Sequence, residues 1–247
     1  MPPPWYNSKI IKIEDQAPGT RRFWVEIEGV DHFEFKPGQF VTMDLPTGEK
    51  RKDRWRSYSI ANAPDGSAVL EFCIVYLEKG RASEFFFNEA HVGTPLRFRG
   101  PAGKFVLPEK LDKELVFICT GTGVAPFRSM LLDLRNRGQL EHRIHLIFGT
   151  RYREGVLYHE EFVQLMKQTP CFQYDVTLSR EKNLNGSFPF RVHRGYVHPV
   201  YLEKYADKNP NRLFYICGWR VMIDEAVDNL VNKLGYDRKQ VVYELYG

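Results

Sequence analysis

Long apolar runs are missing from this sequence of 247 residues, and none approaches the about 18 residues that a membrane span needs. The first residues, Met1–Tyr6, have neither the charged start nor the apolar core of a signal peptide. The net charge is only +4, which is too mild to indicate a nucleic-acid-binding protein. We therefore expect a cytoplasmic globular protein that binds neither membranes nor nucleic acid.

Cysteine is scarce as well, and the four cysteines lie far apart in the sequence, at Cys73, Cys119, Cys171 and Cys217. No two of them have the short spacing of a zinc knuckle or an iron–sulfur loop, so we expect no metal centre on this chain. All but Cys171 lie in or beside apolar segments, which predicts buried thiols.

The first part of the chain, residues 1–110, contains short segments that are rich in β-branched and aromatic residues. Examples are residues 22–27, 38–43 and 68–75, and turn signals such as Pro18-Gly19 and Gly100-Pro101 bound such segments. This pattern predicts an antiparallel β-barrel or sandwich.

In residues 111–247 strand-like segments alternate with segments of helical periodicity. We expect strands at 115–119, 143–149, 172–178, 213–217 and 241–245, and helices near 126–136, 158–168 and 221–234. The alternation predicts a parallel sheet with crossover helices. The fold class is therefore a two-domain chain, with a β-barrel followed by an α/β domain.

Three polar segments follow strands of this parallel sheet, namely Thr120–Gly123, Ser179-Arg180 and Cys217-Gly218. Because ligands of open parallel sheets bind at the carboxyl ends of the strands, we expect the three segments along one ligand-binding edge. The first of them, Thr120-Gly121-Thr122-Gly123, joins a strand to a helix, an arrangement that presents backbone N–H groups to a pyrophosphate. Pro126 stands where the dinucleotide fingerprint has a third glycine or alanine, but proline fits the first turn of a helix.

Three motifs in residues 1–110 have side chains or backbone that suit an anionic cofactor. Arg56-Ser57-Tyr58-Ser59 offers a cation, a flat ring and hydroxyls, and Gly80-Arg81-Ala82-Ser83 opens a short helix with N–H groups and a hydroxyl. The third motif, Gly100-Pro101-Ala102-Gly103, is a turn signal. Taken singly, the first motif favours an ordinary edge strand, and the other two are weak signals.

Taken together, the motifs follow one order at domain-like spacing: Arg56-Ser57-Tyr58-Ser59, Gly80-x-x-Ser83, Gly100-Pro101-x-Gly103, Thr120–Pro126 and Cys217-Gly218-x-x-x-Met222. In this combination the sequence resembles the ferredoxin–NADP(H) reductase family, the plant-type flavoprotein reductases, over nearly the whole chain. Residues 148–151, 158–162 and 243–247 also resemble family segments. The resemblance implies an FAD-dependent oxidoreductase that uses NADPH.

For the flavin, the resemblance implies that Arg56 pairs with the FAD pyrophosphate, that Tyr58 stacks on the isoalloxazine, and that Ser59 hydrogen-bonds near N5. Gly80 and Ser83, with the N–H groups around them, are implied to hold the diphosphate from the other side. Gly103 either lets the chain pass close to the cofactor or makes a tight turn between the domains.

For the nicotinamide coenzyme, the resemblance implies that Thr120–Pro126 binds the pyrophosphate and that Cys217-Gly218, with Met222 in the same motif, lies against the nicotinamide. Tyr246 takes the place of the family's terminal aromatic residue that stacks on the flavin, and Glu244 that of its carboxylate near the flavin edge. The sequence departs from the family in one residue, Gly247, which follows the tyrosine.

The coenzyme preference depends on the residues that meet the adenosine ribose, since a 2′-phosphate needs cations. Ser179-Arg180-Glu181 resembles the NADPH-selective segment of the family, and Arg191 and Arg194 offer further charge. NADPH is therefore expected, with NADH as the alternative.

The basic run Glu49–Arg54 precedes the flavin motif and suits the docking of an acidic electron carrier, although such runs also occur as solvated loops. We expect a ferredoxin or flavodoxin as the partner. The first alternative is the NADH-dependent reductase component of an oxygenase, with an iron–sulfur partner. The second is a flavin- and nucleotide-binding regulatory subunit without turnover.

Overall fold

A computed structural model of the protein describes residues 3–246, so Gly247 lies outside the described residues. The chain forms two compact units. The first contains the residues up to Leu107 together with Ala125–Asp133, and the second contains Pro108–Val124 and the residues from Leu134 onward. The short segment Ala125–Asp133 therefore belongs to the first unit, although it follows the second unit's first strand in the sequence.

The first unit is an antiparallel sheet of six strands in the order β4-β3-β6-β1-β2-β5. The strands are β1 (Trp5–Ala17), β2 (Thr20–Ile27), β3 (Phe40–Asp44), β4 (Trp55–Ser59), β5 (Val69–Val75) and β6 (Pro95–Ala102). Gly100-Pro101 therefore lies inside β6 rather than at a strand boundary, and the sequence-based turn there is wrong. Proline lacks only a ladder N–H, so a position near the end of a strand accommodates it.

The segment after β4 joins the two ends of this strand order. The backbone N–H of Ala61 donates to the carbonyl of Glu71 at 2.8 Å. The Asn62 side chain accepts from the N–H of Glu71 at 2.8 Å and donates to the carbonyl of Val69 at 3.0 Å. These bonds attach the segment after β4 to β5, so the sheet closes into the expected barrel.

Short helices border the flavin motif in this unit. They are α1 (Arg51–Arg54), directly before β4, and α2 (Arg81–Glu84), which continues into the π-helix η1 (Phe85–Glu89). The barrel interior is filled by apolar side chains that are completely buried, including Phe23, Val41 and Phe72. Tyr58 of β4 packs against this core.

The second unit has a fully parallel sheet of six strands in the order β10-β9-β8-β7-β11-β12. The strands are β7 (Glu114–Thr120), β8 (Ile144–Thr150), β9 (Phe172–Leu178), β10 (Arg191–Arg194), β11 (Arg212–Trp219) and β12 (Val241–Tyr246). β7 and β11, which are neighbours inside the sheet, are apolar along nearly their whole length, as expected of strands that are covered on both faces.

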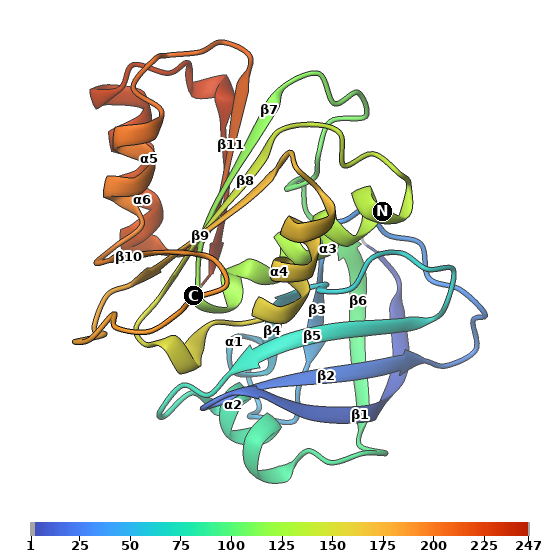
Figure 1. The fold of residues 1–247 in the computed structure, drawn as a ribbon. Coiled ribbons are helices and arrows are strands. Elements are labelled where there is room, and N and C mark those ends of the chain that lie inside the picture. Colours follow the sequence, from blue (N-terminus) through green and yellow to red (C-terminus); the bar gives the residue numbers. More distant parts are fainter. Residues whose placement is uncertain (1–2, 247) are drawn as a thin grey trace. The chain divides into compact units, whose positions relative to one another are not determined.

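The helices are α3 (Ala125–Asn136), α4 (His159–Gln168), α5 (His198–Lys204) and α6 (Arg220–Asp228), and 3-10 or π turns lie at Gly121–Val124 (η2), Arg153–Gly155 (η3), Asn229–Lys233 (η4) and Arg238–Gln240 (η5). Figure 1 shows α5 and α6 along one face of the parallel sheet. Their side chains Tyr201 and Ile223 share a core with Ile118 of β7 and Ile216 of β11. The other face contacts α4, where Phe162 packs on Tyr174 with ring centroids 5.4 Å apart.

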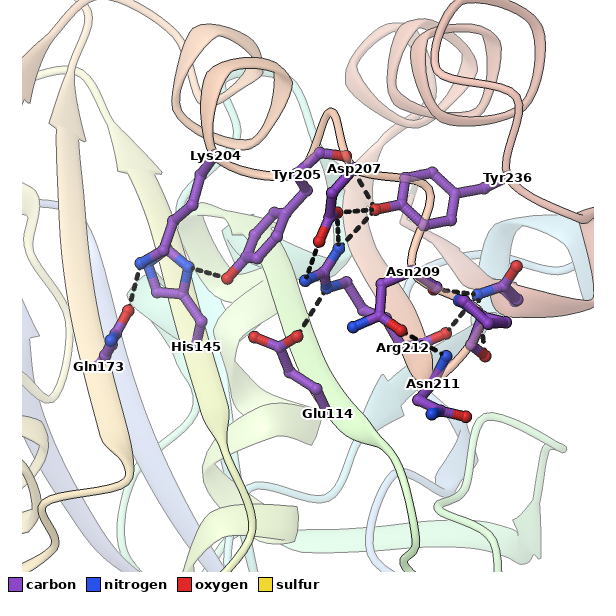
Figure 2. A network of polar contacts seen from close by, with 12 residues as sticks. Glu114, His145, Gln173, Lys204, Tyr205, Asp207, Asn209, Asn211, Arg212 and Tyr236 are labelled. Carbon is purple, nitrogen blue, oxygen red and sulfur yellow. Dashed lines mark hydrogen bonds and ion pairs between the residues drawn. The ribbon is translucent and has the colours of Figure 1, made fainter.

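At the amino edge of this sheet the Arg212 side chain, only 5% exposed as a residue, organises a polar network (Figure 2). Its guanidinium donates to Glu114 at 2.7 Å, to Asp207 at 2.6 Å and to the hydroxyl of Tyr236 at 2.5 Å. The guanidinium also lies over the ring of Tyr205, 4.3 Å from its centroid. The network joins the starts of β7 and β11 to the loop that contains Tyr205 and Asp207 and to Tyr236.

Two further expectations concern the whole chain. Cys73, Cys119 and Cys217 are buried and Cys171 is half-buried, as the sequence predicted. Within residues 3–246, no helix has the length and apolar character that crossing a membrane requires.

Candidate functional site

The flavin motif lies on β4, where strand alternation divides its four residues between two faces. Tyr58 shares a face with Arg56, and its ring packs edge-on against Phe86 in the barrel core, with centroids 5.6 Å apart. Burial raises the pKa of the Tyr58 hydroxyl far above its ordinary value of 10.0. Ser57 and Ser59 face the other way, with Ser57 exposed and Ser59 buried. The structure therefore brings the cation and the ring together and separates them from the two hydroxyls.

The guanidinium of Arg56 is held by the backbone next to it. Its Nη1 donates to the carbonyl of Lys52 in α1 and to that of Trp55, both at 2.7 Å. A guanidinium has five N–H donors, so Nε and Nη2 can still form a fork toward a phosphate. The short helix α1 thus orients the cation that the sequence assigned to the FAD pyrophosphate.

Gly80 and Ser83 shape the turn at the start of α2. The Ser83 hydroxyl is buried, lies 2.8 Å from the carbonyls of both Leu77 and Gly80, and accepts from the N–H of Leu77 at 3.1 Å. A Cβ on Gly80 would come within 2.8 Å of that hydroxyl. The Ser83 side chain is therefore committed to the turn, and the first N–H groups of α2 are the donors that this motif leaves for a ligand.

Gly103 follows β6 in a left-handed conformation, with φ of 106°. Such a φ favours glycine over residues with a Cβ. The Gly103 carbonyl accepts from the side chain of Gln39 at 3.4 Å, within the first unit. The geometry supports a tight turn at this position.

In the second unit, the glycine-rich loop leaves β7 at Thr120 and forms the 3-10 turn η2 before α3 begins at Ala125. Gly121 has a φ of 53°, which glycine adopts without strain. Pro126 lies in the first turn of α3, where no intrahelical N–H bond is lost. The strand–turn–helix arrangement read from the sequence is confirmed.

This loop lies directly against the end of β11. A Cβ on Gly123 would come within 2.5 Å of the carbonyl oxygen of Cys217, and one on Gly218 would come within 2.5 Å of Oγ1 of Thr120 and 2.8 Å of Cε of Met222. Gly218 also has a φ of 150°, within the range that disfavours other residues. Both glycines are therefore required by close approach, and they leave backbone rather than side chains at the carboxyl edge.

Two buried hydroxyls at this edge mark a place for a ligand. Among the described residues, Oγ1 of Thr120 and Oγ1 of Thr177 are buried without a hydrogen-bond partner. A buried polar group without a partner is costly, so such groups call for an explanation. The polar atoms of a nicotinamide dinucleotide at the carboxyl edge would supply those partners, and the glycine backbone leaves room for its pyrophosphate. The residues present therefore fit such a coenzyme.

Thr177 was not identified from the sequence. Its side chain, 1% exposed, projects near the end of β9, in register with Gly149 and His193 of the neighbouring strands. A threonine within an apolar strand is an ordinary strand residue, so only its missing partner distinguishes it.

Cys217, Glu244 and Tyr246 come together where β11 pairs with β12. Cys217 is opposite Glu244 in the strand register and is completely buried. Burial, reinforced by Glu244, raises the pKa of the thiol well above its ordinary value of 9.0, against an opposing interaction with Tyr246. The thiol is therefore neutral near pH 7 and is no nucleophile.

Ser179 and Arg180 follow β9 and pair with the end of β8. The N–H of Ser179 donates to the carbonyl of Thr150, and that of Arg180 to the carbonyl of Arg151, both at 2.9 Å. The loop that follows folds back, because Glu181 accepts from the N–H of Arg153 at 3.2 Å. Two exposed arginines, Arg151 and Arg180, thus start from neighbouring backbone positions.

Of the other two cations expected here, Arg194 joins the same loop and Arg191 does not. The Arg194 guanidinium donates to the carbonyl of Lys182 at 3.1 Å. Arg191 instead lies on β10 beside Asp175, with Nε 3.7 Å from a carboxylate oxygen. Within residues 3–246, no group of three or more potential ligands could hold a metal ion.

Comparison with known families identifies both units. Residues 7–107 match the oxidoreductase FAD-binding domain, and residues 117–228 match the oxidoreductase NAD-binding domain. The first match covers the barrel with β4 and α2, and the second covers the loop at Thr120–Gly123 and the end of β11.

Relatives extend over nearly the whole chain. Ferredoxin–NADP reductase B of Sorangium cellulosum is 32% identical over 248 residues, which cover 98% of this chain and 97% of the relative. The reductase component of phenol 2-monooxygenase from a Pseudomonas species is 27% identical over 241 residues, which cover 98% of this chain but 65% of that relative.

Solved structures share the fold. The chain matches the ferredoxin NADP+ reductase from Neisseria gonorrhoeae with bound FAD and NADP at a TM-score of 0.79 and 24% identity, over 98% of both chains. It matches the FAD/NAD-binding domain of nitric oxide dioxygenase from Vibrio cholerae at a TM-score of 0.83 and 19% identity, again over 98% of both. With these domains, motifs and relatives, the chain belongs to the ferredoxin–NADP(H) reductase family of FAD- and NAD-binding oxidoreductases.

Proposed function

We propose that this oxidoreductase takes electrons from NADPH and passes them one at a time to a separate carrier of the ferredoxin or flavodoxin type. The observation that carries the proposal is the carboxyl edge of the parallel sheet. There, Gly123 packs on the backbone of Cys217, and the buried hydroxyl of Thr120 has no hydrogen-bond partner. A bound FAD supplies the conversion between a two-electron hydride and single electrons.

On the flavin side, the roles follow from the faces of β4. Arg56 binds the FAD pyrophosphate through the donors that α1 leaves unused, and Tyr58 offers its ring as a stacking surface. Ser59 hydrogen-bonds near the flavin N5. The first-turn N–H groups at Gly80–Ser83 bind the diphosphate, and Gly103 shapes the turn beside it.

On the nicotinamide side, Thr120-Gly121-Thr122-Gly123 and the start of α3 at Pro126 hold the coenzyme pyrophosphate with backbone N–H groups. Gly218 leaves space for the nicotinamide, and Met222 packs beneath it. The neutral Cys217 thiol places no charge beside the reacting carbon. Glu244 supplies the carboxylate that acts as a proton donor near the flavin edge, and Tyr246 supplies the aromatic ring that stacks on the flavin. These residues align the reactants, which is the main requirement of hydride transfer.

The preference for NADPH comes from the cations around Ser179. Arg180 and Arg151 are exposed and start from hydrogen-bonded backbone positions, and Arg194 lies in the same loop. Arginine donors suit a 2′-phosphate, while a bare ribose is usually met by a carboxylate. Ser179 adds a hydroxyl, and Arg191, which lies beside Asp175, contributes less.

A cationic and aromatic surface in the first unit supports an acidic protein partner. The rings of Trp5 and Trp55 meet edge to face with centroids 5.2 Å apart. Arg51 and Arg99 lie over Trp55 at 3.9 and 4.3 Å, and Arg97 lies over Trp5 at 4.7 Å. The rings hold these guanidinium groups in place on the strand sheet that carries the flavin motif. Such a charged surface steers the encounter with an oppositely charged protein.

Nearby carboxylates do not cancel this charge, because they are already paired. Asp44 accepts from Arg54 at 2.7 Å, and Asp53 lies 3.2 Å from Arg81. The arginines over the two tryptophans are additional to these pairs. A cytoplasmic location accords with such a partner and remains a prediction.

The second candidate function is that of an oxygenase reductase component that uses NADH. The similarity to the reductase component of phenol 2-monooxygenase favours it. The coenzyme distinguishes the two candidates, because that role needs no cations at the adenosine ribose.

The test is an anaerobic titration of the FAD-loaded protein with NADPH and, separately, with NADH, followed by flavin absorbance. We expect bleaching by NADPH at much lower concentration than by NADH. Preference for NADH would support the oxygenase-reductase role. Purified protein that takes up no FAD, or FAD-loaded protein that neither coenzyme reduces, would contradict the proposed function.

A further inference from the structure

The loop between β9 and β10, residues 179–190, begins with the two residues that we assign to the 2′-phosphate, Ser179 and Arg180. Within this loop no helix or strand forms, so the ladders and helical turns that fix a backbone elsewhere do not fix it. An irregular segment that must hold a cation in place has to be ordered by other contacts, because ordering costs conformational entropy.

One residue outside the loop, Arg153, contacts it at two places. Arg153 opens the 3-10 turn η3 after β8, and its backbone N–H donates to the carboxylate of Glu181 at 3.2 Å. Its guanidinium donates from Nη2 to the carbonyl of Ser187 at 3.4 Å and lies over the ring of Phe188, 4.5 Å from the centroid. Arg153 therefore joins the first and the last residues of segment 181–188.

The ring under the guanidinium is fixed from the interior of the second unit. Phe188 is half-buried, and its ring centroid lies 5.8 Å from that of Phe190. Phe190 in turn lies 5.3 Å from the ring of Tyr174 on β9. Phe190 and Tyr174 are only 8% and 1% exposed. The guanidinium of Arg153 thus rests on the outer member of a row of rings that begins in the core.

These contacts also limit the position of Arg180. Its own N–H is bonded to the carbonyl of Arg151, and the next residue, Glu181, is bonded to Arg153. The backbone of Arg180 is therefore held on both sides. When a loop is ordered before its ligand arrives, binding no longer has to supply the entropy of ordering, and affinity rises without any new contact to the ligand.

From these contacts we propose that Arg153 and Phe188 are specificity-determining positioning residues for an adenosine that carries a 2′-phosphate. Their contact orders segment 181–188, and so presents Ser179 and Arg180 to the phosphate in one arrangement. This inference rests on the proposed function, since it deepens the assignment of NADPH. Binding of a nucleotide without the 2′-phosphate does not depend on the contact, because such a nucleotide makes no use of those two residues.

The experiment measures isothermal titration of wild type, Arg153→Met and Phe188→Leu with adenosine 2′,5′-bisphosphate and with adenosine 5′-monophosphate. These probes differ in the 2′-phosphate and need no turnover. For the bisphosphate we expect affinity to fall by about tenfold in Arg153→Met, which loses the hydrogen bond and the stacked cation. Phe188→Leu removes the ring but no charge and should lower the affinity by about threefold. The monophosphate should bind all three proteins equally.

Two control variants match these changes. Arg143→Met removes an exposed arginine at the opposite end of β8, with the same loss of charge. Phe188→Tyr keeps an aromatic ring beneath the guanidinium. Both controls should bind the bisphosphate like wild type.

Amide hydrogen exchange of residues 181–188 without nucleotide reports the order of the segment directly. Exchange should be faster in Arg153→Met and Phe188→Leu and unchanged in both controls. Wild-type affinity of Phe188→Leu for the bisphosphate would overturn the positioning role even if Arg153→Met binds weakly, because Arg153 would then act through its charge alone. Equal binding of the two probes by wild type would instead contradict the preference for NADPH. A wild-type preference that both variants retain would overturn only the inference about Arg153 and Phe188.

Discussion

The backbone N–H of Arg180 donates to the carbonyl of Arg151 at 2.9 Å, so the two arginines leave neighbouring strands side by side. The preceding pair, Ser179 and Thr150, has the same bond at the same length. Two backbone hydrogen bonds thus join the segments that follow β8 and β9, and both arginines start from this joined backbone. A cation pair of this kind suits a phosphate monoester better than a single flexible arginine does.

Replacement of these cations should change the coenzyme preference. For Arg180→Ala we expect kcat/KM with NADPH to fall by about tenfold, since one charge-assisted hydrogen bond contributes about 1.5–3 kcal/mol. Activity with NADH should change little, because NADH lacks the 2′-phosphate. Arg151→Ala should act in the same direction, and steady-state kinetics with both coenzymes measure the ratio. An unchanged ratio in both variants would place the adenosine elsewhere.

A methyl group at Gly123 should obstruct the coenzyme loop. In Gly123→Ala the new Cβ would lie 2.5 Å from the carbonyl oxygen of Cys217, so loop and strand must move apart. Overpacking of this kind costs about 1–3 kcal/mol, and we expect NADPH affinity to fall by about tenfold. Gly121→Ala is the matched control, because a Cβ there meets nothing within 4 Å and adds only backbone strain. Isothermal titration should rank Gly123→Ala as the weaker binder, and the reverse order would contradict this account.

Removal of Arg212 should destabilise the second unit. Arg212→Met leaves Glu114 and Asp207 without their shared cation at the amino edge of the sheet. Because the Glu114 and Asp207 side chains are 19% and 56% exposed, water can solvate both carboxylates, and we expect a loss of unfolding free energy of about 1.5–3 kcal/mol, the range for hydrogen bonds to a charged group. Urea unfolding followed by circular dichroism measures it. Arg143→Met, at an exposed arginine beside β8, is the control and should lie within about 0.5 kcal/mol of wild type.

Acid should weaken the protein through His145. Its Nε2 lies 3.2 Å from Asp175, and its Nδ1 lies 2.6 Å from the hydroxyl of Tyr205. Burial lowers the pKa of His145 from 6.5, although Asp175 opposes that effect. Between the lowered pKa and 6.5 the unfolded chain binds the proton and the folded protein does not, so stability falls as the pH falls through this window.

The measurement compares thermal midpoints at about pH 7.5 and about pH 5.5. The drop on acidification should be smaller in His145→Asn than in wild type, and His32→Asn, at an exposed histidine, should behave like wild type. Burial also lowers the pKa of His198, so part of the response should remain in His145→Asn. An identical drop in wild type and His145→Asn would exclude His145 as the titrating group.

Five strands of the second unit were readable from the sequence because each is a compact apolar run, and 172–178 was located to the residue. The stretch that follows was not readable. It contains β10 and the helix α5, which are short and interrupted by Gly195 and Pro199. Local pattern is weak in such segments, and tertiary pairing with β9 and burial of Tyr201 determine their structure.

The candidate site also contains residues that the sequence located and contacts that it did not. Residues in named motifs, such as Thr120 and Cys217, could be located in advance because their order along the chain is distinctive. Other features could not be located in advance. Gly123 approaches Cys217, and Arg153 lies over Phe188, although the members of each pair are distant in the sequence. The buried hydroxyl of Thr177 is marked only by its missing hydrogen-bond partner. Such contacts depend on strand order and helix placement, which one sequence does not specify.

The Arg212 network and the arginines around Ser179 lie at opposite ends of the parallel strands. The residues that keep this sheet folded are therefore not the residues that would choose between two coenzymes. Exchanging Arg151 or Arg180 leaves the buried bonds of Glu114, Asp207 and Tyr236 untouched. A lineage with this fold could pass from one coenzyme to the other through stable intermediates, and a protein engineer could follow the same route.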